Sequence, residues 1–138
     1  MPVNDDNVLG FSNPWYPEGF AQAIPYSLPD KMVIQLMPAV YFVATKLAAL
    51  RSRGMRDIRL SSDLEDIIYL IDNRVSFVVE VAQAATGVRA YPATEVRQLL
   101  LHPEIREAID CQLPYGSGSE RKYVIERRLT EIIAATGY

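Results

Sequence analysis

Residues 39–71 decide the fold of this chain, and they read AVYFVATKLAALRSRGMRDIRLSSDLEDIIYLI. Proline suits the first turn of a helix, and Pro38 stands directly before this stretch. Apolar side chains then recur at helical spacing on one face, at Val43, Leu47 and Leu50. We therefore predict a helix that starts at Pro38 and ends at Gly54, with this face buried.

A second helix is predicted from Ser62 onward. Ser62 and Glu65 have the Ser-x-x-Glu spacing of a capping box, in which the two side chains satisfy free N–H groups at the start of a helix. The residues of its expected buried stripe are Leu64, Ile67, Ile68 and Ile71. Asp63 and Asp66 are three residues apart and therefore neighbours on this helix, and we expect them to point away from the stripe.

Further elements are predicted on both sides of these two helices. Further helices are predicted at residues 75–86, 92–101, 103–111 and 119–136. The first 38 residues hold six of the nine prolines, so long helices are not expected there. Two strands are predicted instead, at residues 20–28 and 31–37 around a Pro29-Asp30 turn, after an aromatic loop at residues 13–17.

The expected fold class is α+β and mainly helical, with about five to six helices and a short N-terminal antiparallel β-hairpin. The hairpin belongs to an extended segment at residues 1–38, and the helices form residues 39–138. With 138 residues, 49% of them hydrophobic and 22% charged, the chain has the profile of one compact globular domain.

The composition excludes several classes of site and location. His102 and Cys111 are the only residues of their types, so neither a structural zinc site nor an intramolecular disulfide is expected, and we assign both a structural or surface role. Residues 1–7 do not resemble a secretory signal, and the most apolar run, residues 39–50, is too short to span a membrane. We therefore expect a cytoplasmic protein without membrane association.

Charge is unevenly distributed along the chain. Residues 39–60 carry five basic side chains and one acidic one, whereas residues 61–110 carry four basic and nine acidic ones. Besides Lys46, the basic group contains the arginines Arg51, Arg53, Arg56 and Arg59. Such a density of guanidinium groups is typical of phosphate-binding sites, although cations also stabilise the C-terminal end of a helix. Lys46 lies too early in its helix for the second explanation.

The two aspartates also leave two interpretations open. Paired carboxylates such as Asp63 and Asp66 can bind Mg²⁺ or orient a lysine. Acidic side chains in the first turn also stabilise the positive end of a helix without any further role. Spacing alone does not decide between a site and a helix start.

Three stretches carry a resemblance to a known family: Val8-Leu-Gly-Phe-Ser-Asn-Pro-Trp-Tyr16, Tyr41-Phe-Val-Ala-Thr-Lys-Leu47 and Ser62-Asp-Leu-Glu-Asp-Ile-Ile68. Over roughly residues 1–100, the chain resembles the C-terminal half of nucleotidyltransferases of the AbiEii/AbiGii toxin type. The resemblance implies a polymerase-β-like enzyme in which an N-terminal Gly-Ser/Asp-x-Asp motif binds metal and triphosphate, and a helical part supplies a lysine and an aspartate. Lys46 matches that lysine, Asp63 matches the aspartate, and Asp66 is the second acid of the same motif.

The chain departs from the family in one respect. Its sequence contains no Gly-Ser-x-x-x-Asp-x-Asp motif, and its start matches about the point where the family's strand with the third metal-binding aspartate ends. Nucleotidyl transfer depends on Mg²⁺ held by such carboxylates, so we expect half an active site. We interpret the chain as the helical, nucleotide-facing half of a nucleotidyltransferase, catalytically incomplete alone, which arises as a split subunit, an internal-start product or a relic.

The resemblance also implies roles and partners. Completed by a nucleotidyltransferase core from a neighbouring gene, the enzyme would use Mg²⁺ and an NTP. Lys46 would neutralise the triphosphate, Asp63 would orient Lys46 or an arginine, and the arginines of residues 51–59 would contact phosphates of the NTP or, weakly, of RNA. The competing interpretation is a non-enzymatic interaction module or a homo-oligomeric relic, because the unpaired edges of the predicted hairpin favour self-association.

The connection between the two helices at residues 39–54 and 62–71 is short, which predicts antiparallel packing. This packing places the start of the second helix beside the end of the first, so a contact with Lys46 requires the reach of a lysine side chain, roughly 6 Å, or a steep crossing angle between the helices. We expect Lys46 to approach Asp63 or Asp66 within about 4 Å. The expected partner of the other acid is one of the arginines Arg53, Arg56 and Arg59.

Overall fold

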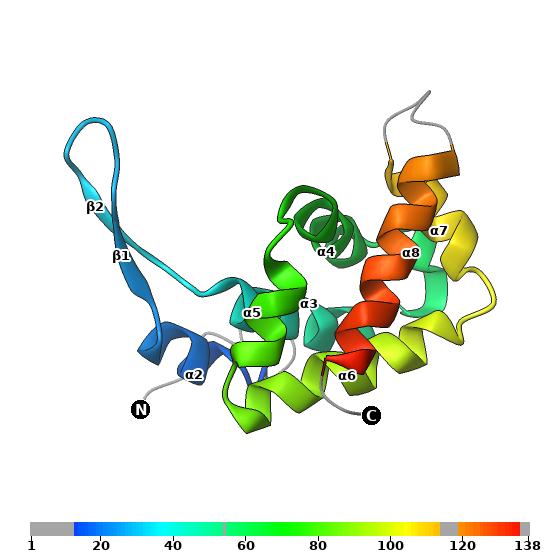
Figure 1. Ribbon diagram of the computed structural model, residues 1–138, viewed down its shortest axis with the longest axis horizontal. Helices are drawn as coiled ribbons and strands as arrows, with labels where there is room; N and C mark the ends of the chain where they lie inside the picture. Colours follow the sequence, from blue (N-terminus) through cyan, green and yellow to red (C-terminus); the bar gives the residue numbers. More distant parts are fainter. Residues whose placement is uncertain (1–12, 54, 114–118, 136–138) are drawn as a thin grey trace.

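A computed structural model describes residues 13–53, 55–113 and 119–135 of the chain, and the fold is mainly helical with a two-stranded antiparallel sheet, as predicted (Figure 1). The elements in chain order are α2 (Tyr16–Ala21), β1 (Ile24–Ser27), β2 (Val33–Leu36), α3 (Ala39–Arg53), the 3-10 helix η1 (Met55–Leu60), α4 (Ser62–Asn73), α5 (Phe77–Gln83), α6 (Thr86–Leu100), α7 (Ile105–Gln112) and α8 (Ser119–Ala134).

Helix α3 is the centre of the molecule. It packs against α2, α4, α5, α6 and η1, and α8 packs across α4, α5 and α6 on the other side (Figure 1). The predicted core face of α3 is confirmed, because Val43, Leu47 and Leu50 are buried. The predicted stripe of α4 is buried as well, at Leu64, Ile67, Ile68 and Ile71. The residues of these two faces belong to the same hydrophobic core.

The capping box predicted for α4 is wrong by one residue. Ser61, not Ser62, is the N-cap, and its hydroxyl oxygen accepts a hydrogen bond of 3.2 Å from the backbone N–H of Leu64. Ser61 is buried and has the extended backbone of a cap, whereas Ser62 is exposed in the first turn. Only Ser62 has the Ser-x-x-Glu spacing, because the third residue after Ser61 is Leu64. The backbone conformation between η1 and α4 nevertheless makes Ser61 the cap.

The boundaries of α5 and α6 also differ from the prediction. The helix expected at residues 75–86 is shorter, and α6 begins at Thr86 rather than at Pro92, which lies inside it. A proline usually marks a first turn because it cannot donate the helical hydrogen bond. Here tertiary packing stabilises the preceding turn: Val88 is buried, and the ring of Tyr91 lies 5.1 Å from that of Trp15.

The aromatic loop predicted at residues 13–17 continues into a helix, α2. This helix includes residues 20 and 21, which were expected to belong to the strand at residues 20–28. Pro17 lies in the first turn of α2, where its missing N–H costs nothing. Before the helix, the buried Asn13 side chain donates to the Thr45 carbonyl at 2.9 Å and accepts from the Trp15 N–H at 3.1 Å. This segment is therefore anchored on α3 and α6.

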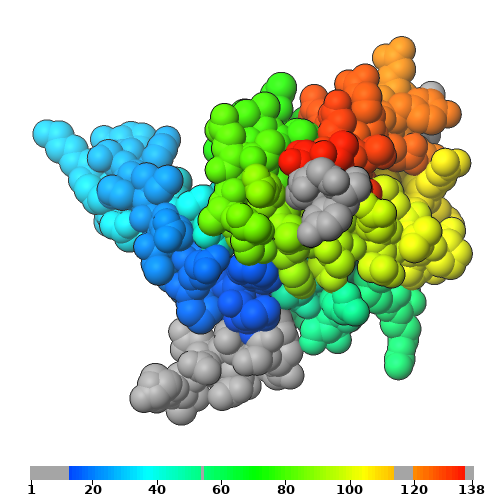
Figure 2. Space-filling view, turned by 60° about the horizontal axis from the view of Figure 1, so that its bottom comes forward, coloured from blue at the N-terminus to red at the C-terminus, as the bar shows by residue number. Residues whose placement is uncertain are grey.

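Strands β1 and β2 form the predicted hairpin, although each strand is four residues long. Its turn contains Pro29 and Asp30 as expected, with the Lys31 N–H donating to the Leu28 carbonyl and Lys31 at φ 70°. The Asp30 carboxylate accepts from the Met32 N–H. Both strands make close contacts chiefly with each other, so the hairpin projects from the helical body (Figures 1 and 2).

The interpretation of His102 as structural is confirmed. Its Nδ1 accepts from the Glu104 N–H at 3.1 Å, and its Nε2 faces the Met55 carbonyl at 3.0 Å, so the ring connects the turn before α7 to η1. Cys111 is an exposed free cysteine. Within the residues that the structure describes, no helix combines the length and the apolar character that crossing a membrane requires.

The two serines before α4 give a matched test of the cap. We expect Ser61→Ala to lower the free energy of unfolding by about 1 kcal/mol, because it leaves the Leu64 N–H without its acceptor. Ser62→Ala should change it by less than about 0.5 kcal/mol, since Ser62 is exposed. Urea denaturation followed by circular dichroism measures both values, and equal effects would show that Ser61 does not cap the helix.

Candidate functional site

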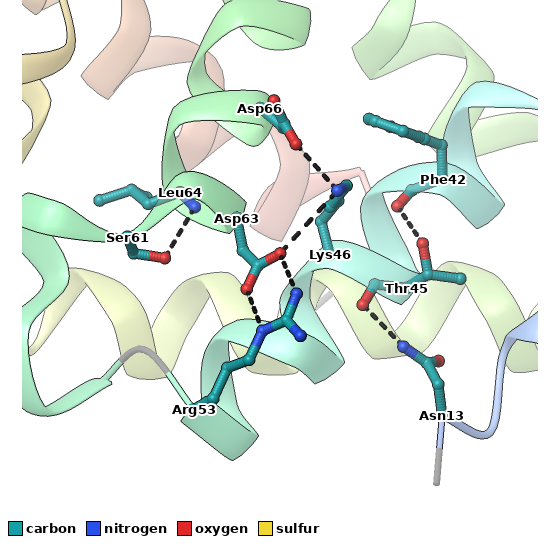
Figure 3. A network of polar contacts seen from close by, with 9 residues as sticks. All are labelled: Asn13, Phe42, Thr45, Lys46, Arg53, Ser61, Asp63, Leu64 and Asp66. Carbon is teal, nitrogen blue, oxygen red and sulfur yellow. Dashed lines mark hydrogen bonds and ion pairs between the residues drawn. The ribbon is translucent and has the colours of Figure 1, made fainter. Parts of the chain in front are cut away.

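Helices α3 and α4 bring together the lysine and both aspartates that the sequence singles out (Figure 3). Lys46 Nζ lies 2.8 Å from Asp66 Oδ2 and 3.9 Å from Asp63 Oδ1. Arg53 Nε lies 3.0 Å from Asp63 Oδ2, and its Nη2 lies 3.2 Å from Oδ1. The predicted contact is confirmed, including the arginine partner of the second acid.

The contacts run in opposite order along the two helices. Arg53 ends α3 and meets Asp63 at the start of α4, whereas Lys46 lies seven residues earlier and meets Asp66 three residues later. These separations are roughly 10 Å along α3 and roughly 4.5 Å along α4, at 1.5 Å per residue. The lysine stem spans the remaining distance, because it reaches roughly 6 Å.

Asp63 is the buried member of the network. Its side chain is 3% exposed, so the expectation that it points away from the α4 stripe is wrong: it lies in the α3–α4 interface. A buried carboxylate requires charged or hydrogen-bonding partners, and Asp63 accepts two N–H groups from Arg53. Hydrogen bonding to Asp63 raises the pKa of the Arg53 guanidinium above its ordinary value, against the opposing effect of burial. Asp63 thereby fixes the orientation of Arg53.

Lys46 and Asp66 form the more accessible half of the network. The side chain of Lys46 is 27% exposed and that of Asp66 is 43% exposed. Lys46 Nζ also lies 5.5 Å from the centre of the Phe42 ring, within the range of a cation–π contact. The turn of α3 that carries Lys46 is held in place, because the Thr45 hydroxyl donates to the Phe42 carbonyl and Asn13 donates to the Thr45 carbonyl (Figure 3).

A groove of about 750 Å³ lies next to this network, between the hairpin, the N-terminal part of α3 and the C-terminal half of α4. Phe42 and Asp66 belong to both, so the Lys46 ammonium, which does not itself line the groove, lies next to the end that these two residues form. The rest of the lining is mostly apolar and aromatic, and its main members are Ile24, Tyr26, Leu36, Met37, Tyr69 and Leu70. A groove of this size and character, with a cation at one end, suits a small ligand that has an apolar or aromatic part and a negative charge.

The predicted phosphate-binding arginines do not gather around the groove. Arg51 pairs with Glu95 of α6 at 2.7 Å, and Arg59 pairs with Glu107 of α7 at 3.1 Å. Arg53 faces α4, as described above. Arg56 is exposed and forms no ion pair within residues 13–53, 55–113 and 119–135. The structure thus directs these arginines toward different helices, where acids neutralise three of them.

Sequence reasoning missed two groups of residues. The groove aromatics Tyr26 and Tyr69 escaped notice because a groove between a hairpin and a helix has no signature in the sequence. Tyr91 and the buried Glu95 escaped notice because only the fold reveals their partners. Burial, together with the smaller effect of the Glu95 carboxylate, raises the pKa of Tyr91 to about 12.

The acids of this site do not fit a Mg²⁺ centre. Asp63 and Asp66 face the cations Lys46 and Arg53, so two positive side chains balance the two carboxylates. In the part of the chain that the structure describes, no three His, Cys, Asp or Glu side chains are grouped so that they could hold a metal ion.

Comparisons of the chain with protein-family models, with curated proteins and with solved structures found no match. The resemblance to nucleotidyltransferases therefore rests on the residues quoted above, and the site on its own geometry.

The two aspartates should differ in their effect on stability. We expect Asp63→Asn to lower the free energy of unfolding by about 1–3 kcal/mol, because it weakens two charge-assisted hydrogen bonds at a buried position. Asp66→Asn should lower it by less than about 1 kcal/mol, since an exposed ion pair contributes little. Chemical denaturation of both variants tests this order, and a larger loss for Asp66→Asn would contradict it.

Proposed function

We propose that this chain is the helical, nucleotide-facing half of a nucleotidyltransferase of the AbiEii/AbiGii type. The observation that carries the proposal is the contact of Lys46 with Asp63 and Asp66 at the end of an aromatic groove. The three residues are those that match the family's motif, and they lie on two different helices. Sequence spacing alone does not require them to meet.

The groove supports a nucleotide as the ligand. A nucleobase is flat and aromatic, and Tyr26, Phe42 and Tyr69 offer rings against which it can pack. Lys46 at the end of the groove is a compact cation that attracts phosphate oxygens. A phosphate would compete with Asp66 for the ammonium group. Asp66 is exposed and can turn away, whereas the buried Asp63 stays bound to Arg53.

The division of roles follows from burial. Lys46 would bind the triphosphate, Asp66 would hold the lysine in place before the nucleotide arrives, and Asp63 would act as a positioning residue through Arg53. The metal-binding acids would come from a nucleotidyltransferase core that carries the Gly-Ser-x-x-x-Asp-x-Asp motif, supplied by a neighbouring gene. The acceptor would be RNA or a protein hydroxyl, as expected for a toxin of this type.

A second candidate is a non-enzymatic interaction module. The exposed apolar residues of the hairpin favour it, because large apolar side chains on a projecting element often mark a contact with another protein. The two candidates differ in the role of Lys46: the first requires its charge for nucleotide binding, and the second does not.

Nucleotide binding distinguishes these candidates. We expect the chain to bind nucleoside triphosphates in isothermal titration calorimetry, and Lys46→Met to weaken binding at least about tenfold, or by about 1.4 kcal/mol. Lys122→Met, on α8 and away from the groove, is the matched control and should bind as the original chain does. Absence of binding, or equal losses in both variants, would refute the nucleotide site.

Catalysis should require the missing core. With Mg²⁺ and radiolabelled NTPs, we expect no transfer of label to RNA by the chain alone, because its sequence lacks the metal-binding motif. Label should appear when a partner with that motif is added, and it should disappear again with Lys46→Ala. Transfer by the chain alone that depends on Lys46 would show that it is a complete enzyme.

A further inference from the structure

The two free edges of the hairpin differ in their capacity to bind another strand. The pairs in register are Ile24 with Leu36, Pro25 with Gln35, Tyr26 with Ile34, and Ser27 with Val33. At the turn, the Leu28 N–H donates to the Met32 carbonyl at 2.8 Å. Hydrogen-bonded and non-hydrogen-bonded pairs alternate along an antiparallel ladder. The backbone groups of Tyr26 and Ile34 therefore form hydrogen bonds with each other. The residues that precede and follow each of them in its strand direct their N–H and C=O groups outward.

On β1, the outward residues are Pro25 and Ser27. Proline has no N–H, so the outer edge of β1 lacks one of its two donors. On β2, the outward residues are Val33 and Gln35, and both have a donor and an acceptor. Charged side chains commonly protect an edge strand from pairing with another strand. The four residues of β2 include none. The edge of β2 is thus the one that can pair with another strand.

The geometry of this edge suits a second copy of the same strand. Two β2 strands that pair antiparallel about a two-fold axis at Ile34 place Val33 of one copy opposite Gln35 of the other, and the reverse. Each of these two pairs exchanges two hydrogen bonds, so every outward group of both strands is satisfied. Ile34 then faces Ile34 of the second copy as the central, non-hydrogen-bonded pair.

The apolar surface around this edge approaches the area that a stable dimer buries. Six large apolar residues on the hairpin and on the adjoining face of α4 are 43% to 71% exposed: Ile24, Tyr26, Met32, Val33, Leu36 and Tyr69. At roughly 200 Å² for each whole side chain, they present roughly 700 Å² per copy. A stable interface buries roughly 800 Å² on each partner. The hairpin projects from the body, so its edge is open to a second molecule (Figure 2).

We infer that the chain forms a symmetric dimer through the free edge of β2, which joins two hairpins into a four-stranded sheet in the order β1-β2-β2-β1. The inference rests on the backbone of the hairpin, and its argument does not require a bound nucleotide. It specifies the edge, the register and the two-fold axis of the association.

Two proline variants test which edge is used. Gln35→Pro removes an outward N–H from β2 and leaves the bonds between β1 and β2 intact, because Gln35 is a non-hydrogen-bonded partner of Pro25. Ser27→Pro makes the same change on the edge of β1. In size-exclusion chromatography with light scattering at about 100 µM, we expect dimers for the original chain and for Ser27→Pro, and a monomer for Gln35→Pro. Circular dichroism and the melting temperature verify that both variants are folded.

A monomeric original chain at this concentration, or a dimeric Gln35→Pro variant, would overturn the inference. Cysteine cross-linking tests the register independently. Central non-hydrogen-bonded pairs place the two Cα atoms about 4.5 Å apart, which is within the range of a disulfide. In a Cys111→Ser background, Ile34→Cys should give a disulfide-linked dimer under mild oxidation, and Ser27→Cys should not.

The cross-linking result also decides the case in which both proline variants lose the dimer. Preferential cross-linking through position 34 would then support the β2 edge and show that Ser27→Pro disturbs the hairpin. Equal or no cross-linking at the two positions would overturn the inference.

Discussion

The buried carboxylate of Asp63 is the constraint on which the arrangement of the site depends. Removal of a carboxylate from water is costly unless cations and N–H groups replace the water, and in this protein Arg53 and Lys46 do so. Both partners come from α3, so the requirement fixes how α4 is positioned along α3. Asp66 is then brought to Lys46 and the groove. The network that allows Asp63 to be buried thus also lies at one end of the groove.

The sequence was sufficient to predict the parts of the fold that depend on local periodicity. The core faces of α3 and α4 and the hairpin turn follow from spacing along helices and from proline positions. The contact between Lys46 and the acids was expected from the short connection between the two helices together with the reach of a lysine side chain. The Ser-x-x-Glu spacing favoured Ser62 as the cap, but the extended backbone of Ser61 makes Ser61 the cap, and no local rule predicts that conformation. Local rules predict which elements form more reliably than where each element begins.

The remaining differences have tertiary causes. Helix α6 continues upstream of Pro92 because Val88 and Tyr91 are packed there, and this packing joins α6 to Trp15, far away in the sequence. The same reasoning applies to the arginines. Their density in the sequence suggested one phosphate site, but three of the four guanidinium groups pair with acids on three different helices, α4, α6 and α7. The groove could not be predicted for a related reason. Its walls are the hairpin and α4, which are separate in the sequence and come together only in the fold.

The hairpin connects the two surfaces on which the proposals rest. Ile24, Tyr26 and Leu36 form one wall of the groove, and they belong to the same strands whose outer edge is free. The strands contact each other far more than they contact the helices, so the body alone does little to fix the position of this wall. Pairing at the edge of β2 would hold the hairpin in one position, and a ligand in the groove would bind against a wall that is already ordered. Two such events share the cost of ordering the hairpin, so each favours the other by the same free energy.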